Sequence, residues 1–102
     1  MKLFIVTCLK DYLGDVSKIF KQANINVFST SNIIGHRGGQ PLSLLEDWFA
    51  SGGEQVDSLM IFTFTSEANA SVGMLLIEKY NEQLLENFPV RAFIMPVEKS
   101  TK

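Results

Sequence analysis

Two short segments of the chain, residues 2–8 and 58–65, are hydrophobic on both of the faces that a β-strand presents. Strand side chains alternate between faces, so in the first segment Leu3, Ile5 and Thr7 share one face while Phe4, Val6 and Cys8 share the other. A sheet with one solvent-facing side alternates apolar and polar residues instead. The pattern therefore predicts a sheet whose two faces are both covered, one by the chain's own helices and the other by another subunit.

The remaining pattern predicts two helices and two further strands. Residues 10–24 have apolar positions at helical spacing, with Asn24 as the stop, and residues 66–86 form a second helix with Ser66 as its N-cap. The stripe of the second helix is predicted to run through Ala68, Val72, Leu75, Leu76 and residues 79–80, Lys79 and Tyr80. Residues 25–34, with a polar middle, predict an edge strand, and residues 90–97 predict the last strand.

The predicted order is therefore βαββαβ, which is typical of an α+β, ferredoxin-like fold. In that fold two helices lie on one face of a four-stranded antiparallel sheet, and the first and third strands are central. These are the two most apolar strands of this chain. The uncovered apolar face is then the predicted subunit contact.

Composition narrows the class of protein. The 102 residues suffice for one domain, and the 46% hydrophobic content is high for so small a chain, which favours buried subunit contacts. A net charge of −2 argues against nucleic-acid binding. The apolar runs are too short to span a bilayer, no signal peptide is recognisable, and a lone Cys8 suits a reducing compartment, so we expect a cytoplasmic protein.

The segment 35–57 is longer than most connections in compact domains and opens with a glycine-rich stretch. Glycines allow backbone N–H groups to approach an anion, and an arginine can make paired hydrogen bonds to phosphate or carboxylate. This stretch is the candidate ligand-binding site, and its residues are Gly35, Arg37, Gly38, Gly39 and Gln40. The alternative is a plain turn with a solvated arginine.

The middle of the same segment is unexpectedly apolar. Leu44, Leu45, Trp48 and Phe49 follow Ser43 at the start of a predicted short helix. Apolar and aromatic residues in an exposed loop suit a partner-binding surface, with Trp48 as the anchor. The alternative is that the short helix folds back onto its own sheet or onto a neighbouring subunit.

Catalytic and metal-binding signals are weak. His36 is the only histidine, and no recognised nucleophile motif accompanies it, so we predict no enzyme. Cys8 and His36 are metal-ligand types without ligand spacing. They would need a site assembled between subunits, where symmetry multiplies each side chain.

The βαββαβ order, the long segment 35–57 and the closing run Phe93-Ile94-Met95-Pro96-Val97-Glu98 together resemble the PII-like signalling superfamily. The resemblance implies one domain over residues 1–102 and a homotrimer with effector clefts between subunits. It also implies a T-loop that contacts a partner such as a membrane transporter or a metabolic enzyme. Adenine nucleotides are typical effectors, and Gly35, Arg37, Gly38 and Gln40 would lie at the ligand-facing base of the loop.

Residues 81–89 lack the glycine- and lysine-rich B-loop of PII proteins. From the resemblance we therefore expect another nucleotide, an anion such as bicarbonate, or a metal ion as the effector. Two other classes share the predicted fold. One is the CutA-like metal-tolerance protein, also trimeric, for which His36 and Cys8 would be the divalent-metal ligands. The other is a small degradative enzyme of the dimeric ferredoxin-like barrel type.

Overall fold

The computed structural model describes residues 1–36, 55–84 and 89–101. Its elements follow the predicted βαββαβ order. They are β1 (Lys2–Leu9), a 3-10 turn η1 (Lys10–Tyr12), α1 (Leu13–Gln22), β2 (Ser29–His36), β3 (Gln55–Thr65), α3 (Glu67–Gln83) and β4 (Arg91–Pro96). The protein is thus α+β, as predicted.

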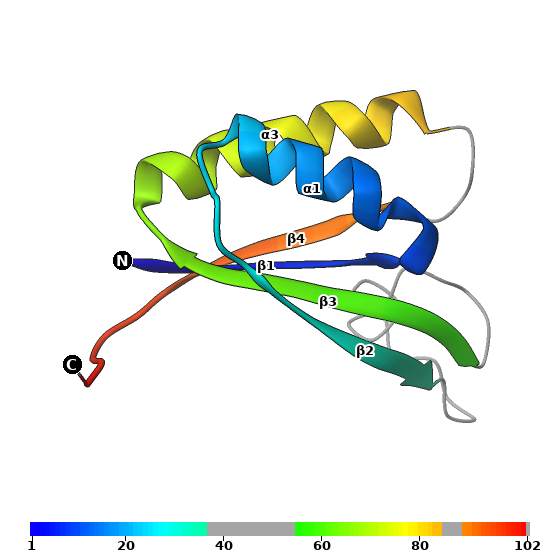
Figure 1. Cartoon of the computed structure of the whole chain (residues 1–102), viewed down its shortest axis with the longest axis horizontal. Coiled ribbons are helices and arrows are strands. Elements are labelled where there is room, and N and C mark those ends of the chain that lie inside the picture. The colour runs from blue at the N-terminus through cyan, green and yellow to red at the C-terminus, as the bar shows by residue number, and fades with distance from the viewer. Residues whose placement is uncertain (37–54, 85–88, 102) are drawn as a thin grey trace.

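The four strands form one antiparallel sheet in the order β2-β3-β1-β4. Both helices lie on the same face of this sheet (Figure 1). The two central strands are β1 and β3, the segments that are apolar on both faces, and β2 lies at an edge as predicted. This arrangement is compatible with a ferredoxin-like fold.

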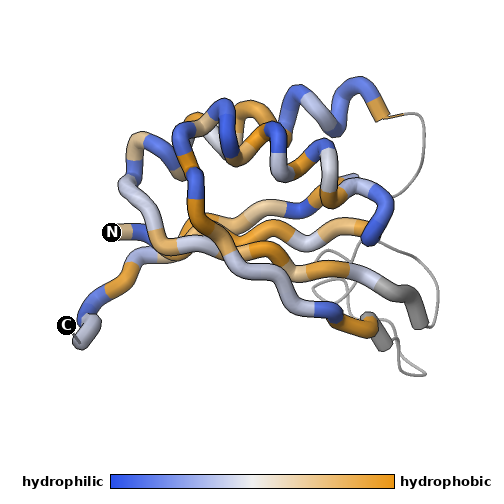
Figure 2. The backbone as a smooth tube through the Cα atoms, in the orientation of Figure 1, coloured by the Kyte–Doolittle hydropathy of each residue, from blue (hydrophilic) through white to orange (hydrophobic). Residues whose placement is uncertain are grey.

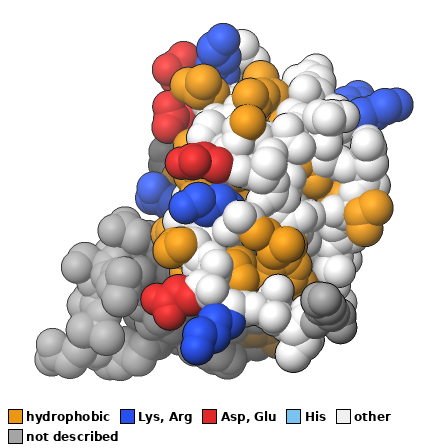
Figure 3. Space-filling model, turned by 90° about the vertical axis from the view of Figure 1, so that its left-hand side faces the viewer, with side chains coloured by type: hydrophobic (Ala, Val, Ile, Leu, Met, Phe, Trp, Pro, Cys, Tyr) orange, Lys and Arg blue, Asp and Glu red, His pale blue; other side chains and the backbone are white. Residues whose placement is uncertain are grey.

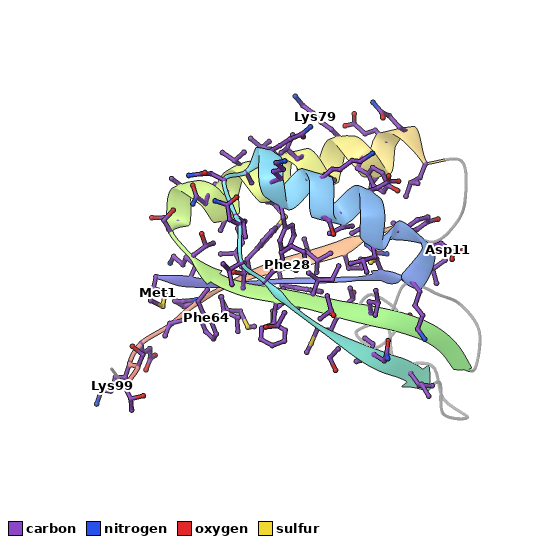
Figure 4. All side chains as sticks on the ribbon, in the orientation of Figure 1. Met1, Asp11, Phe28, Phe64, Lys79 and Lys99 are labelled. Atoms are coloured by element: carbon purple, nitrogen blue, oxygen red, sulfur yellow. The ribbon has the colours of Figure 1, made fainter. Side chains whose placement is uncertain are left out.

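The core fills the layer between the helices and the sheet. Phe4 of β1 and Phe20 of α1 are fully buried, and their ring centroids lie 5.4 Å apart. Phe28, labelled in Figure 4 between the helices and the sheet, packs edge-on against Phe20 at 5.2 Å. On β3 the side chain of Thr63 also faces this layer, where its hydroxyl donates a 2.7 Å hydrogen bond to the Val27 carbonyl. The helix face of the sheet is therefore closely packed.

Helix α1 ends in a Schellman motif. Asn24 adopts the left-handed conformation (φ 63°), its N–H donates to the Lys21 carbonyl, and the N–H of Ile25 donates to the Phe20 carbonyl. Asn24 thus terminates helix α1, as predicted. The predicted strand 25–34, however, starts too early, because Ile25 is the buried apolar residue that closes the motif and β2 begins only at Ser29.

Helix α3 begins as predicted, because the Ser66 side chain accepts a hydrogen bond from the Asn69 N–H. Its predicted stripe is right only in part: Leu76 and Tyr80 pack against the core, whereas Val72 and Leu75 are 43% and 57% exposed. The residues that face the sheet are Ala70, Gly73 and Ile77, with Met74, Leu76 and Tyr80 packed beside them. Small residues at the contact let the helix approach closely, and their low hydropathy hides them from a search for an apolar stripe.

The predicted ends of three elements also shift. Helix α3 stops at Gln83 rather than near residue 86, with Leu84 in an extended conformation. β3 starts three residues earlier than predicted, and β4 is shorter at both ends. The start of β4 is fixed by Asn81 of α3, whose amide group both donates to the Val90 carbonyl and accepts from the Val90 N–H, each at 2.8 Å.

Replacing Gly73 with alanine should destabilise the fold. The new Cβ would lie 2.7 Å from a ring carbon of Phe4, which is fully buried and cannot move without disturbing Phe20. Overpacking of this kind costs about 1–3 kcal/mol, which exceeds the gain of up to ~1 kcal/mol in helix propensity. The matched control is Gly14→Ala in α1, where a Cβ meets nothing within 4 Å. Urea unfolding should show Gly73→Ala less stable and Gly14→Ala as stable as wild type or more so; equal stabilities would contradict the packing.

Candidate functional site

The segment that carries most predicted site residues begins and ends on neighbouring strands. His36 at the end of β2 pairs in register with Gln55 at the start of β3. Gly35 and His36 therefore belong to the hairpin. The other predicted ligand-binding and partner-binding residues lie outside the described residues: Arg37, Gly38, Gly39, Gln40, Leu44, Leu45, Trp48 and Phe49.

All four strands contribute to the end of the sheet from which this segment departs. β1 and β2 end there, and β3 and β4 begin there, because their pairings are antiparallel in the order given above. In Figure 1 this is the right-hand end, where both thin grey segments join the ribbon. The site predicted from residues 35–40 would lie at this end.

The sheet face opposite the helices is apolar over much of its area. Strand register aligns two rows of side chains there, the first being Phe64, Leu3 and Met95 and the second Phe62, Ile5 and Phe93. We call these six residues the apolar back face. Phe64 is 57% and Met95 39% exposed, and Figure 4 shows Phe64 directed away from the helices. The hydropathy colouring of Figure 2 shows the central strands as largely hydrophobic.

Toward residues 37–54, which we call the insertion, the same face carries three polar residues among apolar ones. Thr7 of β1 is paired with Arg91 of β4. Ser58 of β3 is paired with Leu9, which lies two residues beyond Thr7 along β1. Thr7 and Ser58 are fully buried, and the Ser58 hydroxyl has no hydrogen-bond partner. A buried polar group without a partner costs about 1–3 kcal/mol. We call Thr7, Ser58 and Arg91 the polar trio.

The grouping of Thr7, Ser58 and Arg91 was not predicted from the sequence. A signal was present, because Thr7 and Ser58 are polar positions in otherwise apolar strands. Strand periodicity places each of them on a face, but only the register shows that they lie near one another and near Arg91.

A hollow of about 320 Å³ lies along the outer edge of β4. Its lining comes from α3 (Met74, Ile77, Glu78 and Asn81) and from residues 90–93. Arg91 thus belongs both to the lining of this hollow and to the polar trio. At the opposite end of the sheet, Figure 3 shows a described surface on which acidic, basic and apolar side chains are mixed rather than one sign of charge.

The two metal-ligand candidates are far apart within one chain. Cys8 pairs with Leu59, which pairs on its other side with Asn32, so His36 lies two strands away and four residues further along. At ~4.8 Å per strand and ~3.4 Å per residue, their Cα atoms are about 17 Å apart. Cys8 also faces the helices and is fully buried. One ion cannot contact both side chains of a single chain.

A polar contact joins the two helices above this end. The Tyr80 hydroxyl of α3 donates a 2.7 Å hydrogen bond to the Asp15 carboxylate of α1, and the Tyr12 ring packs edge-on against Tyr80. Burial, reinforced by the hydrogen bond to Asp15, raises the pKa of Tyr80. Tyr80 therefore stays protonated and holds α1 against α3.

The comparisons with known proteins leave the family open. No protein-family model matches the chain, and no curated protein matches it either. In the described part of the chain, no helix is long and apolar enough to cross a membrane. Within residues 1–36, 55–84 and 89–101, no three histidine, cysteine, aspartate or glutamate side chains gather into a potential metal site.

Because Cys8 is buried, the free energy of unfolding should fall as the pH becomes alkaline. Burial raises the pKa of the Cys8 thiol from 9.0 to about 11, so the folded state keeps this proton where the unfolded state loses it. The free energy of unfolding should therefore fall between pH 9 and pH 11 by up to about 1.4 kcal/mol per pH unit from this group. Urea unfolding of wild type and Cys8→Ala at pH 8, 9, 10 and 11 isolates the contribution. The stability gap between them should narrow above pH 9; a constant gap would contradict the buried thiol.

Proposed function

We propose that this chain is a subunit of a trimeric, PII-like regulatory protein. It binds a small effector, a nucleotide or an anion, in clefts between subunits. Through the segment 35–57 it contacts a partner protein such as a membrane transporter or a metabolic enzyme. The observation that carries the proposal is the apolar back face, joined at one end to a long insertion between two paired strands.

The back face supports assembly because no helix of the described residues lies on it, and its Phe64 and Met95 side chains are 57% and 39% exposed. Phe64, Met95 and the half-buried Leu3, Phe62 and Phe93 come from three adjacent strands and form a contiguous patch. Contiguous apolar surface of this kind marks interaction sites, and permanent subunit interfaces are the most hydrophobic ones. Three copies that turn this face inward would remove it from water.

The position of the insertion supports a regulatory role. Its two stems are paired strand residues, so the insertion can change conformation while β2 and β3 keep their register. An effector that binds one conformation more tightly than another shifts the population toward it. A partner that contacts the insertion then senses the effector.

The proposed assembly is tested by replacing one apolar residue of the back face with a charged one. Phe64→Lys places a charge in the proposed interface and should give monomers, because an unpaired charge is expensive to bury. Leu75→Lys is the matched control: Leu75 is equally exposed at 57% but lies on α3, across the molecule. Light scattering should show trimers for wild type and Leu75→Lys only. A monomeric wild type, or an unchanged Phe64→Lys trimer, would contradict the proposed assembly.

The insertion is tested by removing it. Because His36 and Gln55 are register partners, an Asn-Gly turn can replace residues 37–54 and close the hairpin directly. The shortened protein should keep the melting temperature and subunit number of wild type but lose any binding of ATP, ADP or AMP measured by calorimetry. Nucleotide binding that survives the deletion would remove the insertion from the effector site. Failure of wild type to bind any of the three at millimolar concentration would remove nucleotides as the effector.

A further inference from the structure

The hydrogen-bonding pattern of the sheet shows which backbone groups each edge strand leaves unpaired. In an antiparallel sheet the N–H and C=O of one residue point to the same neighbouring strand, and those of the next residue point to the other side. The N–H of Val97 donates to the Met1 carbonyl, so the odd-numbered residues of β4 face β1. On the other side, both backbone groups of Val90 are bonded by the Asn81 side chain. The two observations agree on the same alternation.

The register carries this alternation across the sheet to β2. Pairing through β1 and β3 is one-to-one throughout, so the odd-numbered residues of β2 bond to β3. The even-numbered residues of β2 therefore point their backbone groups away from the sheet, and these are Thr30, Asn32 and Ile34. Among the described residues, the one printed contact to these groups is from the Ser31 hydroxyl to the Asn32 carbonyl, and at 3.4 Å it is long for a hydrogen bond.

The outer edge of β2 lacks the features that usually keep an edge strand unpaired. Such features are charged side chains, prolines and bulges. Residues 29–35 contain neither a charged residue nor a proline, and their register with β3 is one-to-one. Residues 29–32 are exposed, and Ile34 is 46% exposed. The edge, which Figure 1 shows at the border of the sheet, is therefore open to another chain.

The opposite edge of the sheet is guarded at both ends. On β4 the Asn81 side chain occupies the outward groups of Val90. At the other end Pro96 also points outward, and a proline has no N–H to donate. Only Ala92 and Ile94 remain between them. The contrast favours β2, not β4, as the edge that another chain joins.

The groups on the β2 edge determine what can bind there. Thr30, Asn32 and Ile34 present N–H and C=O groups that repeat every two residues, about 6.8 Å, over a span of about 14 Å. Another extended chain matches this repeat, and main-chain pairing of this kind is a common mode of peptide recognition. The side chains of Thr30 and Ile34 pair best with hydroxyl-bearing and β-branched residues. β2 leads directly into the insertion, so a protein that contacts the insertion lies next to this edge.

We propose that an extended segment of the partner protein, rich in hydroxyl-bearing and β-branched residues, pairs with the outer edge of β2 and adds a fifth strand to the sheet. The inference rests on the proposed function, because the insertion that follows β2 brings this partner to the edge. It deepens that function by naming the kind of contact, which is main-chain hydrogen bonding to a strand.

Two proline variants test which backbone groups are free. Asn32→Pro removes an N–H that points outward, so its melting temperature should stay within a few degrees of wild type. Ser31→Pro removes an N–H bonded to β3 and should melt at a clearly lower temperature. Hydrogen exchange of wild type is the second measurement: the Thr30 and Asn32 amides should exchange faster than those of Ser31 and Ile33. Slow exchange at Thr30 and Asn32 would overturn the open edge, whatever the prolines do to stability.

A soluble peptide with the core Val-Thr-Val-Thr-Val is the probe for strand addition. Wild type should bind it in a fluorescence titration and should not bind a copy N-methylated at two adjacent residues, which disrupts pairing along both edges of the peptide. Asn32→Pro should weaken binding at least about fivefold, the effect of one lost hydrogen bond. The control is Ser29→Ala, which changes an exposed side chain and no backbone group and should bind as wild type does. Bound peptide should slow hydrogen exchange at Thr30 and Asn32.

The edge site would be overturned by a wild type that does not bind the peptide at millimolar concentration, by undiminished binding to Asn32→Pro, or by slowed exchange at Ala92 and Ile94 instead. A lower subunit number for Asn32→Pro than for wild type in light scattering would assign the edge to a second copy and overturn the partner strand. Trimers that ignore the peptide would overturn the edge site alone. Monomers that bind it through β2 would support the edge site and overturn the trimeric regulator.

Discussion

The two central strands carry apolar side chains on both faces, whereas the helices that the described residues form lie on only one face. The covered face is packed so closely that α3 approaches Phe4 through the bare backbone of Gly73. The other face leaves Phe64 more than half exposed. Burying such a side chain is worth about 1.5–3 kcal/mol, and the proposed assembly would supply that burial.

Thr7, Ser58 and Arg91 lie toward the end of the back face where the insertion joins the sheet. β3 links the three features, because it begins at the stem residue Gln55, continues through Ser58 and then carries Phe62 and Phe64. At ~3.4 Å per residue, the stem and Ser58 are only about 10 Å apart along a paired strand. Ser58 therefore lies close to both the insertion and the proposed subunit contact.

Much of the fold could be predicted from the sequence because it depends on period-two patterns in long apolar strands. The two-faced segments identified the central pair, and Ser66 and Asn24 marked helix ends through local backbone chemistry. The stripe of α3 was predicted only in part, because Leu76 and Tyr80 were found but the contact residues Ala70 and Gly73 are small rather than strongly apolar, and Ile77 was missed. The polar trio could not be found either, because Thr7, Ser58 and Arg91 come from three strands and meet only once the register is known.

Effector binding and assembly are thermodynamically linked if they share the back face. A ligand that binds only the assembled form stabilises it by mass action, and assembly raises the affinity for the ligand by the same factor.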